Sequence, residues 1–580
     1  MKKILGNRLS NSVFAIFCTI IFCAILNFFW RVPLNIHSTP FWWLMIVTAM
    51  FGYGMSTVCE RIFRIINKVK EEREYLYGFD KIKYFFKQKN LSTYFTIISI
   101  ILIVLLIITG VASSKAFNAK RYAAIIEIET GNFEDDVINV ESSDIITVDV
   151  KTAQKLGDRT LGSLEKSSWY DVNQEYNLIS INGEEYRISP IEYGDILKYL
   201  KAKSIPGYVL VNAKTQEAEI VRLEEGMKYS PTAAFKYDLS RHLHYQYPTY
   251  MFGKSFFEVD DEKNPYWITP VRTATIGLRS GLIENSVVIT NAVSGESVEY
   301  ENNNIPEWVD HVHSADYLMN RIEWYYKYSD GFLNSITSKT DVYNTAYSYK
   351  ESKQSDDESQ YTPFEGYNSL VSKNGEVLFY TGITPANSAE TNIGFVLVSP
   401  RTGIAKFYEA NGAEEYSAQV SAEGLVQNLR YSASFPTIIN VDGVETYFMT
   451  LKDGAGLVKK YALCNVEQYS KCVEGDTIEE TINKYKEKLG MKVADSSSDT
   501  SEIELIEKTG TISDVKQAEI DGYTYYYFTL EQNTEIVFMS SIENSNLQPF
   551  MMTAGTNVTI KYYNSQIEEG IGIVKEISLK

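Results

Sequence analysis

Four of the five histidines stand in His-x-His pairs, a spacing that can bind a metal ion. The pairs are His242/His244 and His311/His313. On a β-strand, residues i and i+2 share one face, so two imidazoles can reach one Zn²⁺ at about 2.0–2.1 Å, whereas on a helix they point apart. Residues 306–326 have a helical pattern, so His242 and His244 are the candidate metal ligands. The alternative interpretation is that all four are surface imidazoles with ordinary hydrogen-bond partners.

A run of four carboxylates offers a second set of ligands. Glu258, Asp260, Asp261 and Glu262 could bind Ca²⁺, a hard cation that takes about six or more oxygens. The run lacks the spaced D-x-D-x-D-G pattern of a calcium loop, so a polar turn is the favoured interpretation.

The cysteines fall into two groups. Cys18, Cys23 and Cys59 lie in or at the ends of apolar segments, where we expect them to be packing residues. Cys464 and Cys472 lie in the large polar region and could form one disulfide if that region faces an oxidising compartment.

Enzyme motifs are incomplete in this sequence. H-E-x-x-H, G-x-S-x-G and the phosphate loop G-x-x-x-x-G-K-[ST] are absent. Of the penicillin-binding type, S-x-x-K occurs at Ser163–Lys166 and Ser513–Lys516 and K-T-G at Lys508–Gly510, but S-D-N is missing. The first S-x-x-K and the K-T-G fall in separate predicted domains. We therefore predict no catalytic residue and no cofactor, while a glycosidase carboxylate pair stays an alternative without a location.

Three apolar segments precede the bulk of the chain. They are Val13–Trp30, Phe41–Val58 and Tyr94–Ala112. Each comes close to the ~20 apolar residues that a helix needs to cross a membrane. A secretory signal peptide would supply one such run, not three. The sequence therefore predicts three transmembrane helices within a first domain, residues 1–115.

The charge is divided unevenly along the chain. Residues 1–92 hold 13 of the 55 Lys and Arg but 5 of the 74 Asp and Glu, so the remainder carries a net charge of −27. Nine basic residues lie in the loop 60–92, which the positive-inside rule assigns to the cytoplasm together with the N-terminus. We expect a multi-pass cell-membrane protein that contacts lipid and has a large extracellular C-terminal region. A region this acidic repels phosphate backbones, so no nucleic-acid partner is expected.

The region beyond residue 115 has a β-rich pattern. Short alternating runs are separated by Gly, Asn and Asp turns. Polar stretches at 337–366 and 494–502 are predicted to be boundaries or surface insertions, and we predict α+β regions at 120–340 and 365–493 and a compact segment at 506–580. The fold class is a membrane-anchored multidomain protein: three N-terminal transmembrane helices, then an α+β, β-rich extracytoplasmic region with repeated hairpins and a small C-terminal β-barrel.

Three segments share an alternating run, a turn of fixed length and a second alternating run. They are Tyr208–Ile220 (YVLVNAKTQEAEI), Val287–Glu299 (VVITNAVSGESVE) and Phe395–Phe407 (FVLVSPRTGIAKF). A β-hairpin is predicted for each, with helices between them at 191–201 and 306–326. One turn position holds Gln216, Gly295 and Gly403. Gly is favoured there because it reaches positive φ without a Cβ clash.

The pattern [VT]-[NS]-[AP]-x-[ST]-[GQ]-x-[AS] between two strands resembles PepSY-type modules, which are small extracytoplasmic α+β domains. Ser255–Pro270 (SFFEVDDEKNPYWITP) and Ile439–Leu463 (INVDGVETYFMTLKDGAGLVKKYAL) resemble an uncharacterised family of membrane-anchored proteins of low-GC Gram-positive bacteria. The resemblance implies an architecture and a location, and it implies no catalytic residue.

The last segment has the pattern of five strands. We expect them at 510–515, 523–531, 535–539, 558–563 and 572–577. Their number and spacing resemble an OB-like barrel, a fold that binds oligonucleotides or oligosaccharides or packs against partners. Outside the cytoplasm, the expected ligand is a saccharide or a protein.

Three functions are compatible with these features. The leading hypothesis is a membrane-tethered extracytoplasmic interaction module that binds a protein or cell-wall polymer; the 42 Tyr residues supply rigid contact area and hydroxyl groups for either partner. The alternatives are an envelope hydrolase acting on wall polymers and a structural subunit of a membrane assembly. The three apolar segments contain no acidic or basic residue, which disfavours ion transport by this chain alone.

Overall fold

The computed structural model describes most of the chain and divides it into two compact units. The units are Met1–Met491 and Lys492–Lys580, and each is considered by itself. The described residues are 8–66, 90–137, 145–349, 366–387, 391–491, 505–520, 523–531, 533–541, 552–568 and 571–579. The predicted linker 494–502 and most of the basic loop 60–92 lie outside them.

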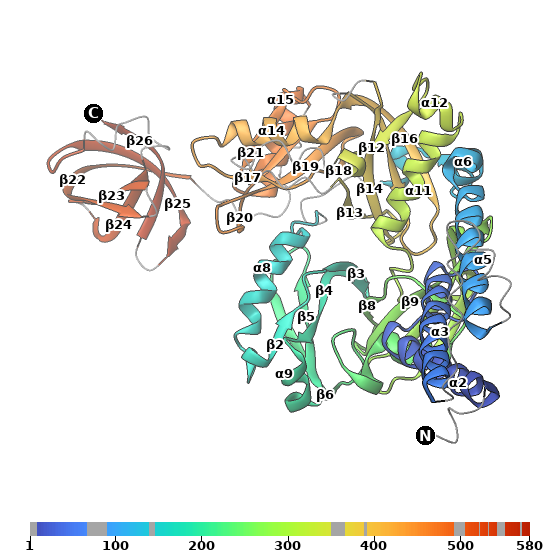
Figure 1. Ribbon diagram of the computed structural model, residues 1–580. Helices are drawn as coiled ribbons and strands as arrows, with labels where there is room; N and C mark the ends of the chain where they lie inside the picture. Colours follow the sequence, from blue (N-terminus) through green and yellow to red (C-terminus); the bar gives the residue numbers. More distant parts are fainter. Residues whose placement is uncertain are drawn as a thin grey trace. The chain divides into compact units, whose positions relative to one another are not determined.

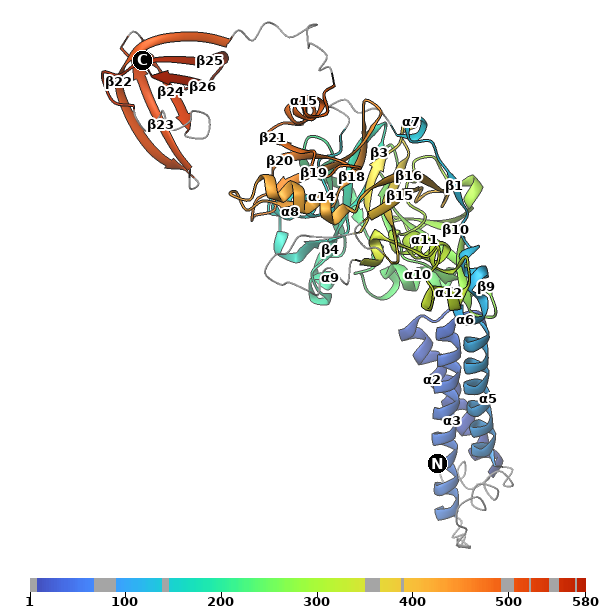
Figure 2. The same ribbon diagram turned by 90° about the horizontal axis from the view of Figure 1, so that it is seen from above.

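Three N-terminal helices are long and apolar enough to cross a membrane, as predicted. They are α2 (Arg8–Trp30), α3 (Thr39–Ile66) and α5 (Leu91–Ala112), and they lie side by side in Figure 2. Phe22 stacks on Phe51 with ring centroids 3.9 Å apart. Gly52 allows close contact between α3 and α5, since a Cβ there would lie 2.6 Å from the Phe95 ring.

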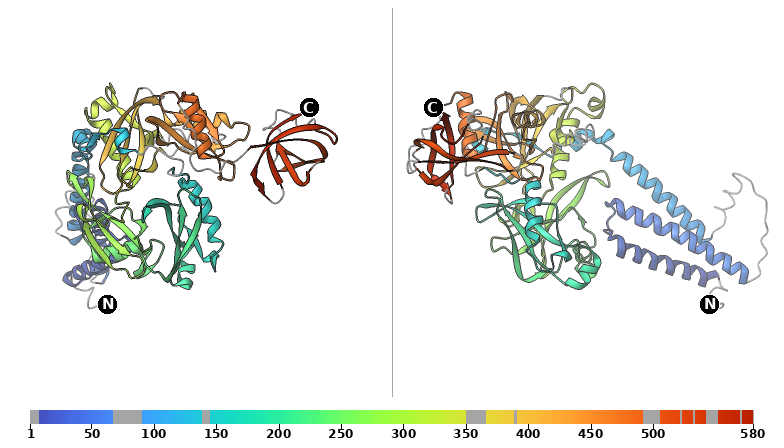
Figure 3. Two further views of the ribbon diagram at one scale, coloured as in Figure 1. Left: turned by 180° about the vertical axis from the view of Figure 1, so that it is seen from behind. Right: turned by 90° about the vertical axis from the view of Figure 1, so that its left-hand side faces the viewer.

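The same end of all three helices contacts the β-rich body (Figure 3). Arg31, just after α2, forms an ion pair with Asp238 at 2.6 Å. His37, just before α3, donates a hydrogen bond from Nδ1 to the carbonyl of Leu278 at 2.6 Å. Beyond α5, helix α6 (Lys115–Ala123) buries Tyr122 against the body. These polar contacts fix the body at one end of the helix bundle.

Four five-stranded antiparallel assemblies form the body, and they share one topology (Figure 1). In each, the first, third, fourth and fifth strands pair in that order, and the second strand pairs with the third. A helix precedes each set. We call the sets modules 1 to 4: α8 to β6, α10 to β11, α11 to β16, and α14 to β21. The short strand β1 (Ile128–Thr130) adds in parallel to the edge of module 3.

The bounds of these elements are as follows. Module 1 comprises α8 (Val150–Leu161), β2 (Tyr170–Val172), β3 (Asn177–Ile181), β4 (Glu184–Tyr193), α9 (Ile196–Ala202), β5 (Ile205–Asn212) and β6 (Ala218–Met227). Module 2 comprises α10 (Leu239–Gln246), β7 (Met251–Phe252), β8 (Phe256–Val259), β9 (Pro265–Ile276), β10 (Ser280–Asn291) and β11 (Ser297–Glu301). Module 3 comprises α11 (Ala315–Tyr328), α12 (Phe332–Ile336), β12 (Tyr343–Thr345), β13 (Asn368–Val371), β14 (Val377–Pro385), β15 (Thr391–Val398) and β16 (Ala405–Ala413). Module 4 comprises α14 (Glu415–Leu425), β17 (Ser432–Ala433), β18 (Thr437–Val441), β19 (Val444–Lys452), β20 (Val458–Asn465) and β21 (Cys472–Gly475), followed by α15 (Ile478–Leu489).

The three predicted hairpins are the last two strands of modules 1, 2 and 3. Their turn residues have equivalent contacts, which explains the shared sequence pattern. Asn212, Asn291 and Ser399 each accept a backbone N–H of the turn with their side-chain oxygen. Gln216 (φ 64°), like Gly295 (φ 81°) and Gly403 (φ 75°), is left-handed. Gln216 is therefore a strained exception, because its Cβ disfavours this backbone conformation.

The residue after each of these Asn or Ser residues contacts the segment that leads into the helix of the same module. The carbonyl of Ala213 accepts the N–H groups of Thr147 and Val148, just before α8. In module 2 the carbonyl of Ala292 likewise accepts two N–H groups ahead of α10, and in module 3 that of Pro400 accepts two ahead of α11. Each hairpin turn thus holds the chain ahead of the helix of its own module, directly before α8 and α11 and about ten residues before α10.

The structure corrects two predicted helices and places a strand in one of the polar stretches. The helix expected over 306–326 begins only at Ala315, where the Ser314 side chain accepts the Tyr317 N–H as an N-cap. Residues 191–201 are divided between β4, which ends at Tyr193, and α9. The polar stretch 337–366 contains β12, the edge strand of module 3.

The modules associate in two similar pairs. Modules 1 and 2 share one hydrophobic core, and modules 3 and 4 share another. Asn177, which begins β3, donates a hydrogen bond to the Phe257 carbonyl of β8 at 3.5 Å. Asn368, which begins β13, donates to the Phe435 carbonyl at 3.1 Å and to Thr437 of β18 at 2.6 Å. The same strand-end asparagine therefore joins the partners in each pair.

The C-terminal unit has all five expected strands. They are β22 (Leu505–Ile520), β23 (Tyr523–Leu530), β24 (Asn533–Ser541), β25 (Asn557–Glu568) and β26 (Ile571–Leu579). They pair in the order β22-β23-β24-β26-β25, and β25 pairs back onto β22, so the ladder closes. Its interior holds apolar side chains that are almost fully buried, among them Ile512, Phe528 and Phe538.

Candidate functional site

A cleft of about 200 Å³ lies where modules 1, 2 and 3 meet. Module 1 contributes residues 174–178, which lead into β3, and module 2 contributes Lys254 and Phe256. The segment ahead of α11 contributes His311, and residues 367–369 complete the wall. The cleft is therefore built from segments that are far apart in the sequence.

Aromatic rings and polar groups alternate around this cleft. Tyr367 packs edge-on against Phe379, with ring centroids 5.6 Å apart. At the rim, Lys254 forms an ion pair with Glu175 at 2.7 Å, and both side chains are about half exposed. An apolar surface with a few convergent polar groups is typical of small ligand sites. The volume suits one ring or one short side chain of a larger ligand.

His311 is the buried imidazole of this cleft, and Glu258 orients it. Its Nδ1 donates a hydrogen bond to Glu258 Oε1 at 2.8 Å, and the His311 and Asp310 N–H groups donate to the same carboxylate at 2.8 and 2.9 Å. The ring packs near Phe256 and Phe379. Nε2 has no hydrogen-bond partner among the described residues. Since Nδ1–H is donated, Nε2 of a neutral ring can accept a hydrogen bond or a proton from a ligand.

Asp310 is a second buried carboxyl group in this region, next to Glu258. It is 9% exposed, and its Oδ2 accepts the Ser180 N–H at 2.7 Å. Burial, reinforced by the neighbouring carboxylate of Glu258, raises the pKa of Asp310 to about 7. A carboxyl that titrates near neutrality therefore lies beside the Glu258–His311 pair.

His313 belongs to a separate buried network. Its Nδ1 donates to Glu284 Oε2 at 2.8 Å, and its ring stacks on Tyr317 at 5.2 Å. Glu284 Oε1 also accepts from Arg272 Nε at 2.9 Å and Nη2 at 2.8 Å. The second His-x-His pair lies in an irregular segment ahead of α11 rather than in a helix, and each ring is bonded to a different glutamate.

The predicted metal ligands His242 and His244 lie on α10, a helix, where residues i and i+2 point apart. His242 Nε2 donates to the Gly295 carbonyl at 2.8 Å, whereas His244 Nε2 lies 3.5 Å from Asn27 on α2. The strand geometry that chelation requires is absent from this pair. Within the described ranges, no group of three or more His, Cys, Asp or Glu side chains could hold a metal ion.

The acidic run begins on strand β8 with Glu258 and continues into the turn between β8 and β9, and its members have different contacts. Glu258 points inward, as described above. Asp260 accepts the Asn264 N–H at 2.7 Å, and Asp261 accepts the Asn182 N–H at 3.3 Å. The described contacts thus match the polar-turn interpretation.

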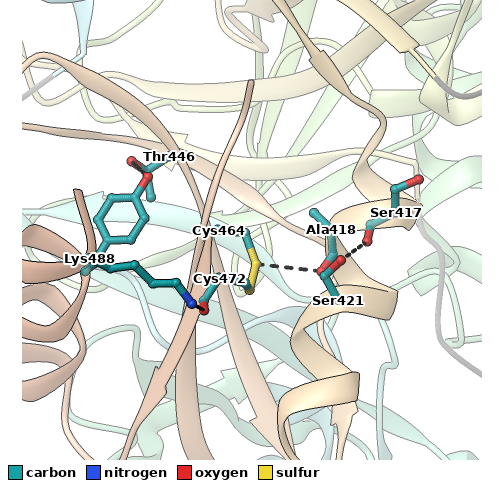
Figure 4. The surroundings of a disulfide bond; sticks show 8 residues. Ser417, Ala418, Ser421, Thr446, Cys464, Cys472 and Lys488 are labelled. Carbon is teal, nitrogen blue, oxygen red and sulfur yellow. Dashed lines mark hydrogen bonds between the residues drawn. A yellow bond between two sulfur atoms is a disulfide. The ribbon is translucent and has the colours of Figure 1, made fainter. Parts of the chain in front are cut away.

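Cys464 and Cys472, which the sequence showed could form a disulfide, are joined by one (Figure 4). It joins β20 to β21, where module 4 has a hairpin of the same kind as modules 1 to 3. Asn465 follows the first cysteine and accepts the Gln468 N–H at 2.8 Å, as Asn212 does in module 1. Sequence reasoning missed this fourth hairpin because its turn is one residue longer. The usable signal was Asn465 at the end of an alternating run.

The S-x-x-K matches do not form a site. Ser163 caps the end of α8 by donating to the Thr160 carbonyl, and the Lys166 ammonium lies over the Trp169 ring. K-T-G (Lys508–Gly510), near the start of strand β22, and the second S-x-x-K (Ser513–Lys516) lie on that one strand, in the other compact unit.

Comparison with known proteins adds no assignment: no family model, no curated protein and no solved structure matches this chain. Fold and function are therefore argued from the geometry alone.

Proposed function

We propose that this chain is a membrane-tethered extracytoplasmic module that binds a cell-envelope partner. The observation that carries the proposal is the set of contacts between the helix ends and module 2. Arg31, His37 and the end of α5 all contact the body, so Ile66 and Asn90, which border the basic loop, stand at the opposite helix ends. Because the positive-inside rule assigns that loop to the cytoplasm, the modules belong on the outer side.

The cleft supports a ligand-binding role, and its chemistry favours a wall polymer over a protein. Aromatic rings such as Tyr367 and Phe379 can stack on a sugar ring, while Lys254, Glu175 and the oriented His311 offer hydrogen bonds of both kinds. The small volume accepts one such ring at a time. A protein partner that inserts one side chain is the competing outcome.

The family resemblances enter as part of this proposal. The topology common to four modules supports a PepSY-like origin for each, and the closed ladder of five strands supports an OB-like C-terminal segment. Both kinds of fold suit the binding of partners outside the cytoplasm.

Protease protection tests the tether. In intact protoplasts, added protease is expected to remove a C-terminal tag and most of the mass, leaving a fragment of about the first 115 residues. A fully protected tag would overturn the orientation.

Sedimentation with purified cell-wall sacculi tests the cleft. The full-length chain in lipid nanodiscs is expected to co-sediment, and Tyr367→Ala should weaken this about tenfold, as loss of a central aromatic contact does. Tyr469→Ala is the matched control, since Tyr469 is 47% exposed on the module 4 turn, away from the cleft. Equal binding by both variants would refute the cleft assignment.

The hydrolase alternative rests on the Glu258–His311 pair beside the cleft. If the wild-type chain releases soluble fragments from sacculi and His311→Gln does not, the enzyme interpretation replaces simple binding. If neither chain releases fragments, the binding proposal stands.

A further inference from the structure

A second cavity, of about 410 Å³, lies between the helix ends and module 2. The loop between α2 and α3 forms one wall, and α10, β7, β9 and the β9–β10 turn form the others. Three arginines and two histidines line it: Arg31, Arg272, Arg279, His37 and His244. None of the described residues that line it is Asp or Glu. Such a cavity attracts an anion, and it does so within a chain whose net charge is −19.

Arg279 is the cation of this cavity that has no carboxylate partner among the described residues. Its guanidinium donates to neutral oxygens: the Leu106 carbonyl at 2.7 Å, Thr109 Oγ1 at 3.1 Å and Thr39 Oγ1 at 3.1 Å. By contrast, Arg31 is paired with Asp238 and Arg272 with Glu284. Nε of Arg279 also donates to Thr109 Oγ1, at 3.3 Å. Because all these partners are neutral, they leave the positive charge of Arg279 to attract a phosphate into this partly buried site.

The cavity lies beside the end of α5 and the start of α3, where these apolar helices meet the β-rich body. Arg279 contacts the last turns of α5 through Leu106 and Thr109, and the first residue of α3 through Thr39. Trp30 and Trp43, close to the same helix ends, are 51% and 50% exposed. Exposed tryptophans at helix ends are typical of the membrane–water interface, where lipid phosphates lie.

The remaining walls of the cavity include apolar side chains, which can contact the glycerol and the first methylenes of a lipid. Leu243, Met251, Phe252 and Leu282 supply apolar surface beside the arginines. A phosphate at the cationic side would leave the glycerol and the first methylenes against these side chains. A soluble phosphate would use the cationic side alone.

We propose that this cavity binds the phosphate of an anionic phospholipid headgroup, with Arg279 as its principal contact. The inference rests on the proposed membrane location. It adds a specific lipid site on the outer face, distinct from the basic loop on the other side.

The test is a titration of the full-length chain in detergent micelles, followed by tryptophan fluorescence. The probes are short-chain phosphatidylglycerol, short-chain phosphatidylcholine and inorganic phosphate. Wild-type protein is expected to bind phosphatidylglycerol saturably, and Arg279→Gln should weaken it about tenfold or more, through loss of a charge-assisted hydrogen bond. Arg121→Gln is the matched control, because Arg121 lies near the same helix end and donates to the Thr275 carbonyl outside the cavity lining.

A second variant guards against misfolding of the first. Ser240→Glu places a carboxylate at an exposed cavity residue in the first turn of α10, where an acid stabilises a helix. It too should weaken phosphatidylglycerol binding, with the melting temperature unchanged. The proposal is overturned if phosphatidylcholine binds equally well, or if both cavity variants bind like Arg121→Gln.

The remaining outcomes separate the sources of phosphate. Inorganic phosphate binding as tightly as phosphatidylglycerol, with the same dependence on Arg279, would assign the site to a soluble anion and overturn the lipid assignment. Because the titration uses micelles, it reports on the cavity even if protoplast protease experiments contradict the proposed orientation.

Discussion

Cys464 and Cys472 are joined at the residue pair that closes the module 4 hairpin, where module 3 has Val398 and Ala405. In module 2 the same pair is Thr290 and Ser297, whose hydroxyl groups are hydrogen bonded at 2.9 Å. One structural position thus carries an apolar pair, a hydrogen bond or a covalent bond. Module 4 has the longer turn, and it is the module with the covalent bond.

Replacing the cysteines by the module 3 pair, Cys464→Val with Cys472→Ala, should keep the fold but lower its free energy of unfolding. Closing a loop of about eight residues contributes about 2.5 kcal/mol by the chain-entropy relation. Chemical denaturation of the full-length chain in micelles measures the difference. Adding a reductant to wild-type protein is the control and should reproduce the loss, whereas the double variant should be insensitive to it.

The left-handed turn position offers a graded test of strain. Gly403→Ala should cost about 1 kcal/mol, because φ is positive and the nearest His313 atoms, at 3.4 Å, leave room for a Cβ. Gly295→Ala should cost more, since its Cβ would lie 2.2 Å from the Tyr229 ring. Gln216→Gly should stabilise by about 0.5–1 kcal/mol, while Gln216→Ala, which keeps the Cβ, should not. Equal costs at Gly295 and Gly403 would contradict this ranking.

Asp310 should make stability fall as pH rises. Burial and Glu258 raise its pKa to about 7, so between about pH 4 and 7 the folded state keeps a proton that the unfolded state releases. The free energy of unfolding should therefore decline across this window by an amount on the order of 2–4 kcal/mol and level off above it. His311 and Arg401 oppose the shift without cancelling it.

The comparison is between wild-type protein and Asp310→Asn, by thermal unfolding from pH 5 to 8. The asparagine oxygen can still accept the Ser180 N–H, but it cannot ionise. The free energy of unfolding of the Asp310→Asn protein should therefore decline less with rising pH than that of wild-type protein. Glu445, whose pKa burial also raises to about 7, is unchanged in both proteins and cancels in the difference. Parallel pH profiles would show that Asp310 does not titrate in this range.

Much of the local structure was predictable because its causes are local. The apolar length of α2, α3 and α5 requires long helices whatever surrounds them. Alternating runs joined by Asn-Ala or Ser-Pro turns predicted three hairpins, and Gln216 occupies the left-handed turn position that Gly295 and Gly403 occupy in the other two. The helix boundary at Ala315 was not predicted, because the buried, irregular segment before it is held by distant glutamates rather than by its own pattern.

The sequence by itself determined the elements: the three apolar helices, the hairpin turns and the five C-terminal strands follow from periodicity and backbone preference within about 20 residues. Only the tertiary structure decided which side chains meet. Glu258 reaches His311 across 53 residues, and Arg279 reaches Leu106 across 173, because packing of the modules on one another and on the helix ends brings them together. Such contacts depend on how remote surfaces fit. Both cavities, and hence both proposed sites, are products of that packing.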